Sequence, residues 1–167
     1  MLLDLSKLIP NPGASVPFET TLDLSELDFG GSRPVSEPVT AAGTVRNTAG
    51  VLEMKGSVRT SLHAVCDRCT ERFVREVSFP IDAVLVTDAA SEDAEDPWVF
   101  DLVDDCADLD DIATTVFVLN MPSQLLCRPD CRGLCFRCGA NLNLGPCTCK
   151  AEPDPRFAAL QQLLEKK

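Results

Sequence analysis

The sequence predicts an α+β fold: an antiparallel β-meander with one or two helices and a zinc-organised, cysteine-rich C-terminal segment. Three observations predict it. Apolar and polar residues alternate with a period of two through the middle of the chain, and one later stretch has apolar residues at helical spacing. In addition, eight of the nine cysteines stand in close pairs. The length of 167 residues is enough for one domain with a small metal-stabilised appendage.

The strands are expected first at residues 18–24 and then over the longer runs 35–46, 51–65 and 72–86. The second and third of these runs flank a short polar turn over 47–50 that ends in glycine. The third and fourth runs are joined by a C-x-x-C sequence. The meander is therefore expected to carry a metal-type knuckle at one hairpin tip.

After the meander come an acidic loop at 87–97 and a further short strand at 98–103. A helix is expected over 108–120, with Asp108 as its N-cap and Pro122 beyond its end. Its apolar stripe has near-helical spacing: Leu109, Ile112, Val116 and Leu119.

A second helix is expected near the C-terminus, where Asp154 and Pro155 suit an N-cap and a first helical residue. The predicted organisation is therefore a β-rich domain over 1–122, with the C-x-x-C hairpin tip and the acidic loop. It is followed over 123–167 by the zinc segment and a C-terminal helix packed on the first part.

The net charge of −11 comes from one part of the chain. Twelve acidic residues and no Lys or Arg lie within 82–111, whereas the rest of the chain has 15 basic and 14 acidic residues. This composition lacks the basic signature of a general nucleic-acid binder. The acidic stretch is interpreted either as a solvated loop or as a charge that mimics or repels RNA phosphate or docks a basic protein.

The N-terminus does not have the pattern of a signal peptide, and the longest apolar stretch is too short to span a bilayer. A cytoplasmic location is therefore expected. In that reducing compartment, nine cysteines indicate metal binding rather than disulfides.

Four cysteine pairs supply the eight thiolates that two tetrahedral zinc ions need. Loop closure predicts how the pairs are shared: the 139–146 loop is short, so the two pairs that flank it form one local site. The other two pairs are separated by 57 residues, and a structural zinc that contributes about 10 kcal/mol offsets that closure. The predicted sites are Cys135, Cys138, Cys147 and Cys149, and Cys66, Cys69, Cys127 and Cys131.

Other interpretations of the cysteines are a redox dithiol, a catalytic zinc, and disulfides or inert buried thiols. A redox C-x-x-C is expected to open a helix after a strand, and a catalytic zinc needs an open coordination position. Cys106 is expected to be a plain thiol, and His63 an ordinary strand residue. Because no catalytic motif is present, no enzymatic activity and no small-molecule substrate are expected.

The motif from Cys66-Asp67-Arg68-Cys69 through Leu126–Asn143 to Gly145-Pro146-Cys147-Thr148-Cys149 resembles the YceD family of large ribosomal RNA subunit accumulation proteins. The resemblance runs from about residue 18 to the end. One departure is Phe136, where the family often has proline. The resemblance implies a non-catalytic role in bacterial large-subunit ribosomal RNA accumulation and ribosome assembly.

The partner expected from this resemblance is large-subunit ribosomal RNA or a pre-ribosomal particle, with a ribosomal protein as a further partner. An alternative is an adaptor for ribosomal proteins that makes no direct RNA contact, and a thiol redox protein is a third reading. Candidate RNA-binding residues are the basic side chains around the knuckles: Arg68, Arg72, Arg75, Arg128, Arg132, Arg137 and Lys150.

Overall fold

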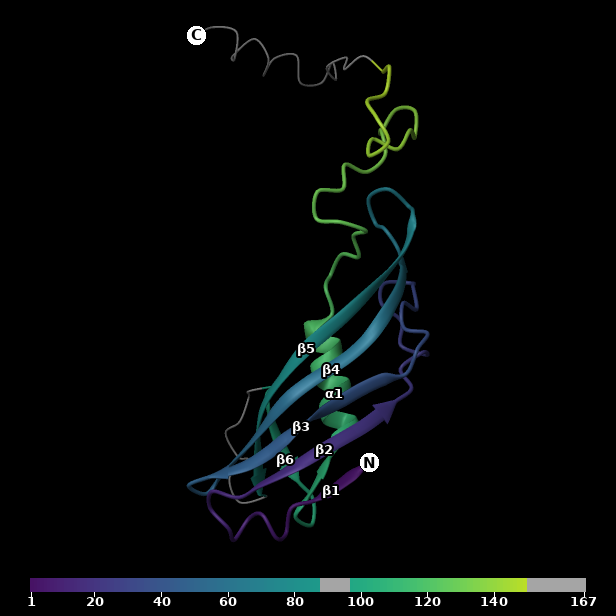
Figure 1. The fold of residues 1–167 in the computed structure, drawn as a ribbon. Coiled ribbons are helices and arrows are strands. Elements are labelled where there is room, and N and C mark those ends of the chain that lie inside the picture. The colour runs from purple at the N-terminus through teal and green to yellow at the C-terminus, as the bar shows by residue number, and fades with distance from the viewer. Residues whose placement is uncertain (88–96, 150–167) are drawn as a thin grey trace, which may run out of the picture.

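The computed structural model describes residues 1–87 and 97–149, and its largest element is a twisted five-stranded sheet (Figure 1). The strand order is β2–β3–β4–β5–β6. The strands are β2 (Ser15–Leu22), β3 (Val39–Thr48), β4 (Val51–Val65), β5 (Arg72–Thr87) and β6 (Val99–Leu102). Neighbours from β2 to β5 are antiparallel, which confirms the predicted meander.

The last strand departs from the meander, because β6 lies parallel to β5. Val84 of β5 is opposite Val99 of β6, and Thr87 is opposite Leu102. An antiparallel neighbour needs only a tight turn, whereas the longer connection over 88–98 leaves both directions open. The strand itself was predicted from the sequence, but its direction was not.

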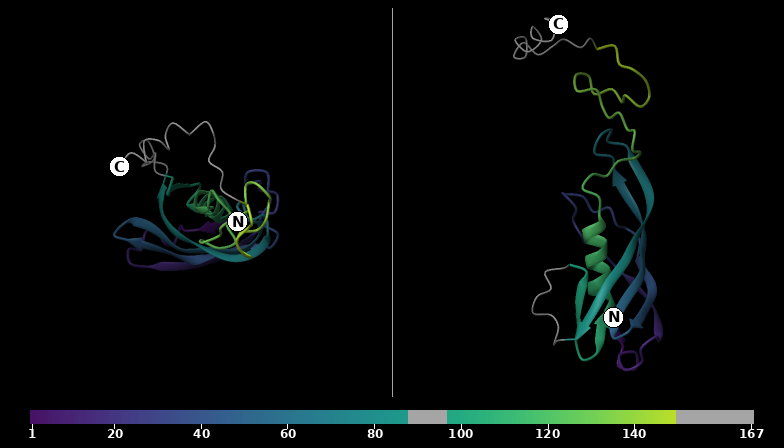
Figure 2. Two further views of the ribbon diagram at one scale, coloured as in Figure 1. Left: turned by 90° about the horizontal axis from the view of Figure 1, so that it is seen from above. Right: turned by 90° about the vertical axis from the view of Figure 1, so that its left-hand side faces the viewer.

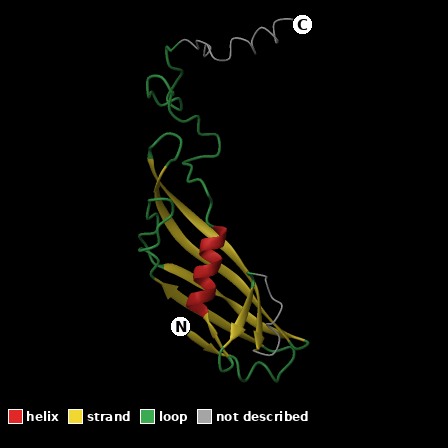
Figure 3. Ribbon diagram, turned by 180° about the vertical axis from the view of Figure 1, so that it is seen from behind, coloured by secondary structure: helices red, strands yellow, loops and turns green. Residues whose placement is uncertain are grey.

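One helix, α1 (Leu109–Asn120), covers a face of the sheet, and the strands curve around it (Figures 2 and 3). Its N-cap is Asp108, as predicted, and the Asp108 carboxylate accepts hydrogen bonds from the backbone N–H groups of Asp110 and Asp111. A two-stranded sheet of β1 (Leu2–Asp4) and β7 (Cys106–Asp108) leads directly into the helix. The pairing of β1 with β7 was not predicted.

The core lies between α1 and the sheet, because alternate strand residues face the helix. Phe117 is fully buried, and its ring makes edge contacts with Phe29 at 6.0 Å and Phe79 at 5.6 Å between ring centroids. The expected stripe was wrong at Leu119, which is 53% exposed. The buried arc instead consists of Leu109, Ile112, Ala113, Val116 and Phe117. Leu119 falls at the edge of that arc.

The β3–β4 hairpin has a two-residue turn in which Ala49 and Gly50 both adopt positive φ angles, 54° and 96°. Asn47, which is 1% exposed, stabilises the turn by accepting a hydrogen bond from the Gly50 N–H. Its amide nitrogen donates to the carbonyls of Leu8 and Ile9. This side chain therefore ties the N-terminal segment to the turn.

The β4–β5 hairpin is the longest of the sheet and extends past the helix toward the cysteine-rich segment (Figure 1). Within 1–87 and 97–149, no helix has the length and apolarity to cross a membrane. The predicted C-terminal helix and nearly all of the predicted acidic loop lie outside the described residues.

Candidate metal centres

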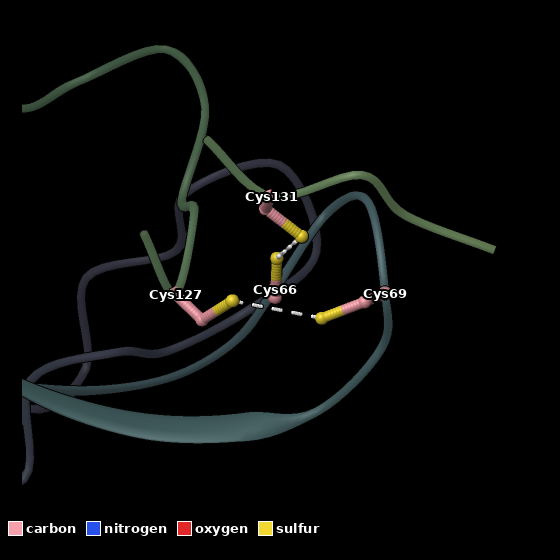
Figure 4. Close-up of side chains that lie close together, drawn as sticks. All are labelled: Cys66, Cys69, Cys127 and Cys131. Atoms are coloured by element: carbon pink, nitrogen blue, oxygen red, sulfur yellow. Dashed lines mark hydrogen bonds between the residues drawn. The ribbon is translucent and has the colours of Figure 1, made fainter. Parts of the chain in front are cut away.

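The first candidate centre is a group of four thiols at the tip of the β4–β5 hairpin (Figure 4). Cys66 and Cys69 come from the hairpin tip, and Cys127 and Cys131 come from the segment after α1. The sulfur atoms lie within 4.8 Å of one another and point toward a common centre. Two of these Sγ–Sγ distances are 3.8 Å, between Cys66 and Cys131, and 3.6 Å, between Cys69 and Cys127.

These distances fit a tetrahedral metal. A zinc–sulfur bond of about 2.3 Å places two sulfurs of a tetrahedron about 3.8 Å apart. A disulfide needs about 2.05 Å between its sulfurs, and all nine cysteines are free thiols. The four-thiol donor set therefore suits a structural zinc, and Cys66, Cys69, Cys127 and Cys131 would hold it.

The second candidate centre is formed by the other four paired thiols, which also lie within 4.8 Å of one another. The Sγ atoms of Cys135 and Cys147 are 3.4 Å apart. The structure thus brings the eight thiols together in the two sets that loop closure predicts. The second set, Cys135, Cys138, Cys147 and Cys149, lies in the cysteine-rich segment beyond the hairpin tip.

The two C-x-x-C knuckles share one backbone design. In each, the residue after the second cysteine donates its N–H to the carbonyl of the first: Thr70 to Cys66 and Gly139 to Cys135. The first cysteine in turn donates to the carbonyl five residues ahead. The donors Thr70 and Gly139 have positive φ angles of 59° and 72°. Glycine adopts this conformation without steric cost, whereas a threonine in it is strained.

Hydrogen bonds from the first knuckle hold the C-terminal segment against the hairpin. Asp67 makes two of them with Leu125: its N–H donates to the Leu125 carbonyl at 2.9 Å, and its carboxylate accepts from the Leu125 N–H at 2.6 Å. Arg68 donates to the Cys131 carbonyl at 3.0 Å. Arg75 donates to the Leu126 carbonyl, and its guanidinium lies 5.3 Å from the centroid of the Phe73 ring.

Asn143 connects the two centres. It lies between ligands of the second group, yet its amide nitrogen donates to the Cys131 sulfur of the first group at 3.3 Å. Its carbonyl oxygen accepts from the Arg132 N–H at 2.8 Å. Nearby, Asn141 donates to the Glu71 carboxylate at 2.9 Å. The cysteine spacing predicted a short loop over 139–146 but not which residues the loop would contact.

The electrostatics lower the pKa of some thiols before any cation is bound: Cys66 and Cys131 in the first group and Cys135 in the second. In the first, burial acts to raise the pKa of Cys66, but backbone N–H groups of Cys127, Cys69 and Arg68 outweigh it and lower that pKa to about 6. In the second, the N–H groups of Cys138 and Arg137 lower the pKa of Cys135 to about 6.

The opposite effect acts on other thiols of each group: the pKa values of Cys69 and Cys127 are raised in the first, and that of Cys149 is raised in the second. Burial, together with the contact to Cys69, raises the pKa of Cys127 to about 12. The hydrogen bond with Cys138, together with burial, raises the pKa of Cys149 to about 12. Because metal ligands bind as thiolates, a cation entering either group displaces protons.

The candidate RNA-binding residues divide into two sets. The side chains of Arg68 and Arg75 make the hydrogen bonds to backbone carbonyls described above, which gives both a structural role. Exposed arginines around the two centres are Arg72, Arg128, Arg132 and Arg137. Arg128 also lies 3.5 Å from the Asp130 carboxylate, and Lys150 falls outside the described residues.

Two side chains singled out in the sequence lie apart from both groups. Cys106 is in β7, and His63 is an exposed residue of β4 whose Nε2 atom is 3.2 Å from the Glu37 carboxylate. The residues missed by sequence reasoning are Asp67, Thr70 and Asn143. Their roles depend on contacts with distant segments or on an unusual φ angle, for which the sequence gives no signal.

Comparison with known proteins gives one family match, to the model described as Large ribosomal RNA subunit accumulation protein YceD, over residues 54–164. A maize protein, named Large ribosomal RNA subunit accumulation protein YCED homolog 1, chloroplastic, is 30% identical over 154 residues. These cover 74% of this chain and 52% of that protein.

Mycobacterial relatives match over a greater length. A Mycobacterium tuberculosis protein whose name assigns no function is 28% identical over 174 residues, which cover 98% of this chain and 81% of the relative. A Mycobacterium leprae protein is also 28% identical, with 98% and 77% covered. No solved structure matches the chain significantly.

Proposed function

The chain belongs to the YceD family of large ribosomal RNA subunit accumulation proteins, and from this premise we propose that it is a non-catalytic zinc protein of large-subunit assembly. In this proposal it binds two zinc ions and contacts large-subunit ribosomal RNA or a pre-ribosomal particle in the cytoplasm. The observation that carries the metal part is the pair of four-thiol groups. The ribosomal part of the proposal rests on membership of the family.

Zinc is the proposed metal because four thiolates in a tetrahedron suit zinc, which does not change its oxidation state. A structural role follows from the same donor set, since four sulfur ligands leave no coordination position for water or substrate. In the first centre the metal would join the hairpin tip to the segment after α1. In the second it would organise residues 135–149, which have little apolar patterning of their own.

RNA contact is proposed for the exposed arginines at this end of the molecule: Arg72, Arg128, Arg132 and Arg137. The charge at the opposite end of the sheet supports an approach of RNA from the cysteine-rich end. Exposed carboxylates cluster around β6, β7 and the start of α1, at the end of the sheet far from the cysteine-rich segment (Figure 1). Because they repel phosphate, RNA is expected to approach the cysteine end.

The acidic end also favours a second candidate, an adaptor that docks a basic ribosomal protein and never touches RNA. Asp101, Asp104, Asp105 and Asp111 are exposed there. Salt dependence separates the two functions, because phosphate contacts release counterions and give a steep loss of RNA affinity with salt. An adaptor shows no binding to isolated ribosomal RNA at any salt concentration.

The experiment that tests the proposed function combines metal analysis with a cellular readout. Protein purified without chelator is expected to contain two zinc ions per chain by elemental analysis. Cells lacking the protein are expected to accumulate less large-subunit ribosomal RNA relative to small-subunit RNA. A copy with Cys66→Ser and Cys135→Ser should fail to restore that ratio, whereas Cys106→Ser, outside both groups, should restore it.

Two results would contradict this proposal. One is protein with no zinc and freely titratable thiols at all eight positions. The other is an unchanged ratio of the two ribosomal RNAs in cells that lack the protein. Ribonuclease treatment of the tagged protein's partners then distinguishes the RNA-contact form from the adaptor form, since only the adaptor keeps its ribosomal proteins.

A further inference from the structure

Phe136 is the most exposed large apolar side chain in the described part of the chain, with 90% of its surface in contact with solvent. It occupies the tip of the second knuckle, between Cys135 and Cys138. The knuckle fold requires this position, because the two cysteines turn their sulfurs toward the other ligands. The Cys135 N–H, which donates to the Ala140 carbonyl, closes the loop.

The ring is accompanied by a cation. The Arg137 guanidinium lies 5.7 Å from the centroid of the Phe136 ring. Such an arrangement pairs an aromatic face with a charged planar group. Elsewhere in the described structure aromatic rings such as Phe79 and Phe117 pack into the core, so Phe136 stands apart as a ring presented to solvent.

The net charge of the second module, residues 132–149 with their zinc, limits which ligands it can attract. Arg132 and Arg137 contribute two positive charges between 132 and 149, with no acidic residue in that range. Four thiolates around one zinc leave about two net negative charges, which balance them. Attraction of phosphate to this knuckle is therefore weak, and a ligand must gain free energy mainly from contact with the ring.

An unpaired nucleotide meets this requirement. Its base has a flat face that stacks on an aromatic ring and on a guanidinium, while its phosphate pairs with an arginine. A duplex offers no free base face. We propose that Phe136, together with Arg137, is a stacking platform for an unpaired nucleotide of RNA. This inference rests on the proposed function and adds the class of RNA and the contact residue.

The test uses the full-length, zinc-loaded protein and a fluorescently labelled single-stranded oligoribonucleotide of mixed sequence. The same strand annealed to its complement is the comparison. Anisotropy titrations at several salt concentrations give affinity and salt slope. The wild-type protein is expected to bind the single strand more tightly than the duplex. Phe136→Ala is expected to weaken single-strand binding by about 5- to 150-fold without changing the salt slope.

Matched variants separate stacking from general apolar contact. Phe136→Trp is expected to bind at least as tightly as wild type, whereas Phe136→Leu should be as weak as Phe136→Ala. Leu144→Ala removes another highly exposed apolar side chain, 84% exposed, and should leave affinity unchanged. Arg132→Gln should instead reduce the salt slope by about one phosphate contact. Zinc content and circular dichroism verify that each variant is folded.

Three results would overturn the inference. In the first, Phe136→Ala binds like wild type. In the second, Phe136→Leu keeps full affinity, which indicates an apolar docking site for protein. In the third, the wild-type protein does not bind single-stranded RNA. The proposed function is tested by the cysteine variants in cells, so it stands or falls independently of these titrations.

Discussion

At the scale of single residues, Thr70 and Gly139 occupy the same position in the two C-x-x-C knuckles, and both have positive φ angles. A left-handed conformation costs a residue with a side chain about 1–2 kcal/mol, and a β-branched threonine is especially poorly suited to it. The first knuckle is therefore held in a strained conformation by the contacts around it.

Thr70→Gly is expected to raise the free energy of unfolding by about 0.5–1 kcal/mol. The relief of strain exceeds the extra conformational entropy of glycine in the unfolded chain. Thermal unfolding of the zinc-loaded protein measures the effect. The reciprocal variant, Gly139→Thr, should lower stability. A less stable Thr70→Gly protein would show instead that the hydroxyl bond to the Cys69 carbonyl outweighs the strain.

Asn143 supports the first centre although it lies between two ligands of the second. Removing a hydrogen bond to a metal ligand commonly lowers metal affinity 10- to 100-fold. Asn143→Ala is accordingly expected to weaken zinc binding at the first centre by about 10-fold or more. Competition with a chromophoric chelator measures it.

Leu144→Ala provides the control for Asn143→Ala, because Leu144 is adjacent and 84% exposed. As chelator is added, the Asn143→Ala protein is expected to lose zinc in two phases. Its first centre should lose zinc at a lower chelator concentration than the first centre of the wild type. Identical chelator curves for Asn143→Ala and Leu144→Ala would contradict the assigned role.

At the scale of elements, α1 begins at a cap that depends on ionisation. Partial burial acts to raise the pKa of Asp108, but N–H groups of Asp110 and Asp111 outweigh it and hold that pKa below the usual value. A group whose folded pKa is depressed stabilises the protein above its unfolded pKa, near 3.8, and loses that contribution as pH falls through the folded pKa.

Asp108→Ala is expected to cost about 1 kcal/mol of unfolding free energy at pH 7. Asp108→Asn should cost less, because its side-chain oxygen still caps the helix. Urea unfolding at pH 7 and at pH 3 is the measurement. The difference between wild type and Asp108→Asn should be smaller at pH 3 than at pH 7, because the contribution of the carboxylate declines below the unfolded pKa of 3.8. A constant difference would indicate that the cap does not titrate.

The strand boundaries show how much of the sheet the alternation of apolar and polar residues predicts. Residues 51–65 alternate clearly and are flanked by turn-forming sequences, and β4 was predicted to the residue. The beginning of β3 was placed four residues too early, at 35 instead of Val39. Val35 is buried and forms an isolated bridge with Leu62, so its apolar character reflects packing rather than membership of the strand.

At the scale of the whole molecule, the first centre joins parts of the chain that are far apart in sequence, and the second centre is local. Cys135→Ser is therefore expected to disorder mainly residues 134–149 and to leave the sheet folded. Cys66→Ser should free the segment after α1 from the hairpin tip. Amide chemical shifts of the two variants locate the changes.

The separation is not complete, because Asn143 and Asn141 link the second module to Cys131 and Glu71. Cys135→Ser should therefore also shift the amides of Cys131 and Glu71 slightly. Large and identical shifts throughout β4 and β5 in both variants would contradict the assignment of four thiols to each centre.

The sequence alone determined those features whose cause lies in neighbouring residues. Alternation defines β2 to β5, and the Asp108 side chain caps the helix that follows it. The sharing of cysteine pairs follows from loop lengths. In the first two cases the interacting residues are close in the chain. In the third, the distance along the chain affects only the entropic cost of closing the loop, which grows slowly with loop length.

Only the tertiary structure decided which distant groups meet. It set the direction of β6 and paired β1 with β7. It directed the guanidinium groups of Arg68 and Arg75 to backbone carbonyls, 63 and 51 residues away in the sequence, and left the Phe136 ring in solvent. A sequence shows that an arginine carries donors. Which acceptor the arginine reaches depends on which distant segment packs beside it. A buried carbonyl needs a donor and accepts from the one that packing places next to it.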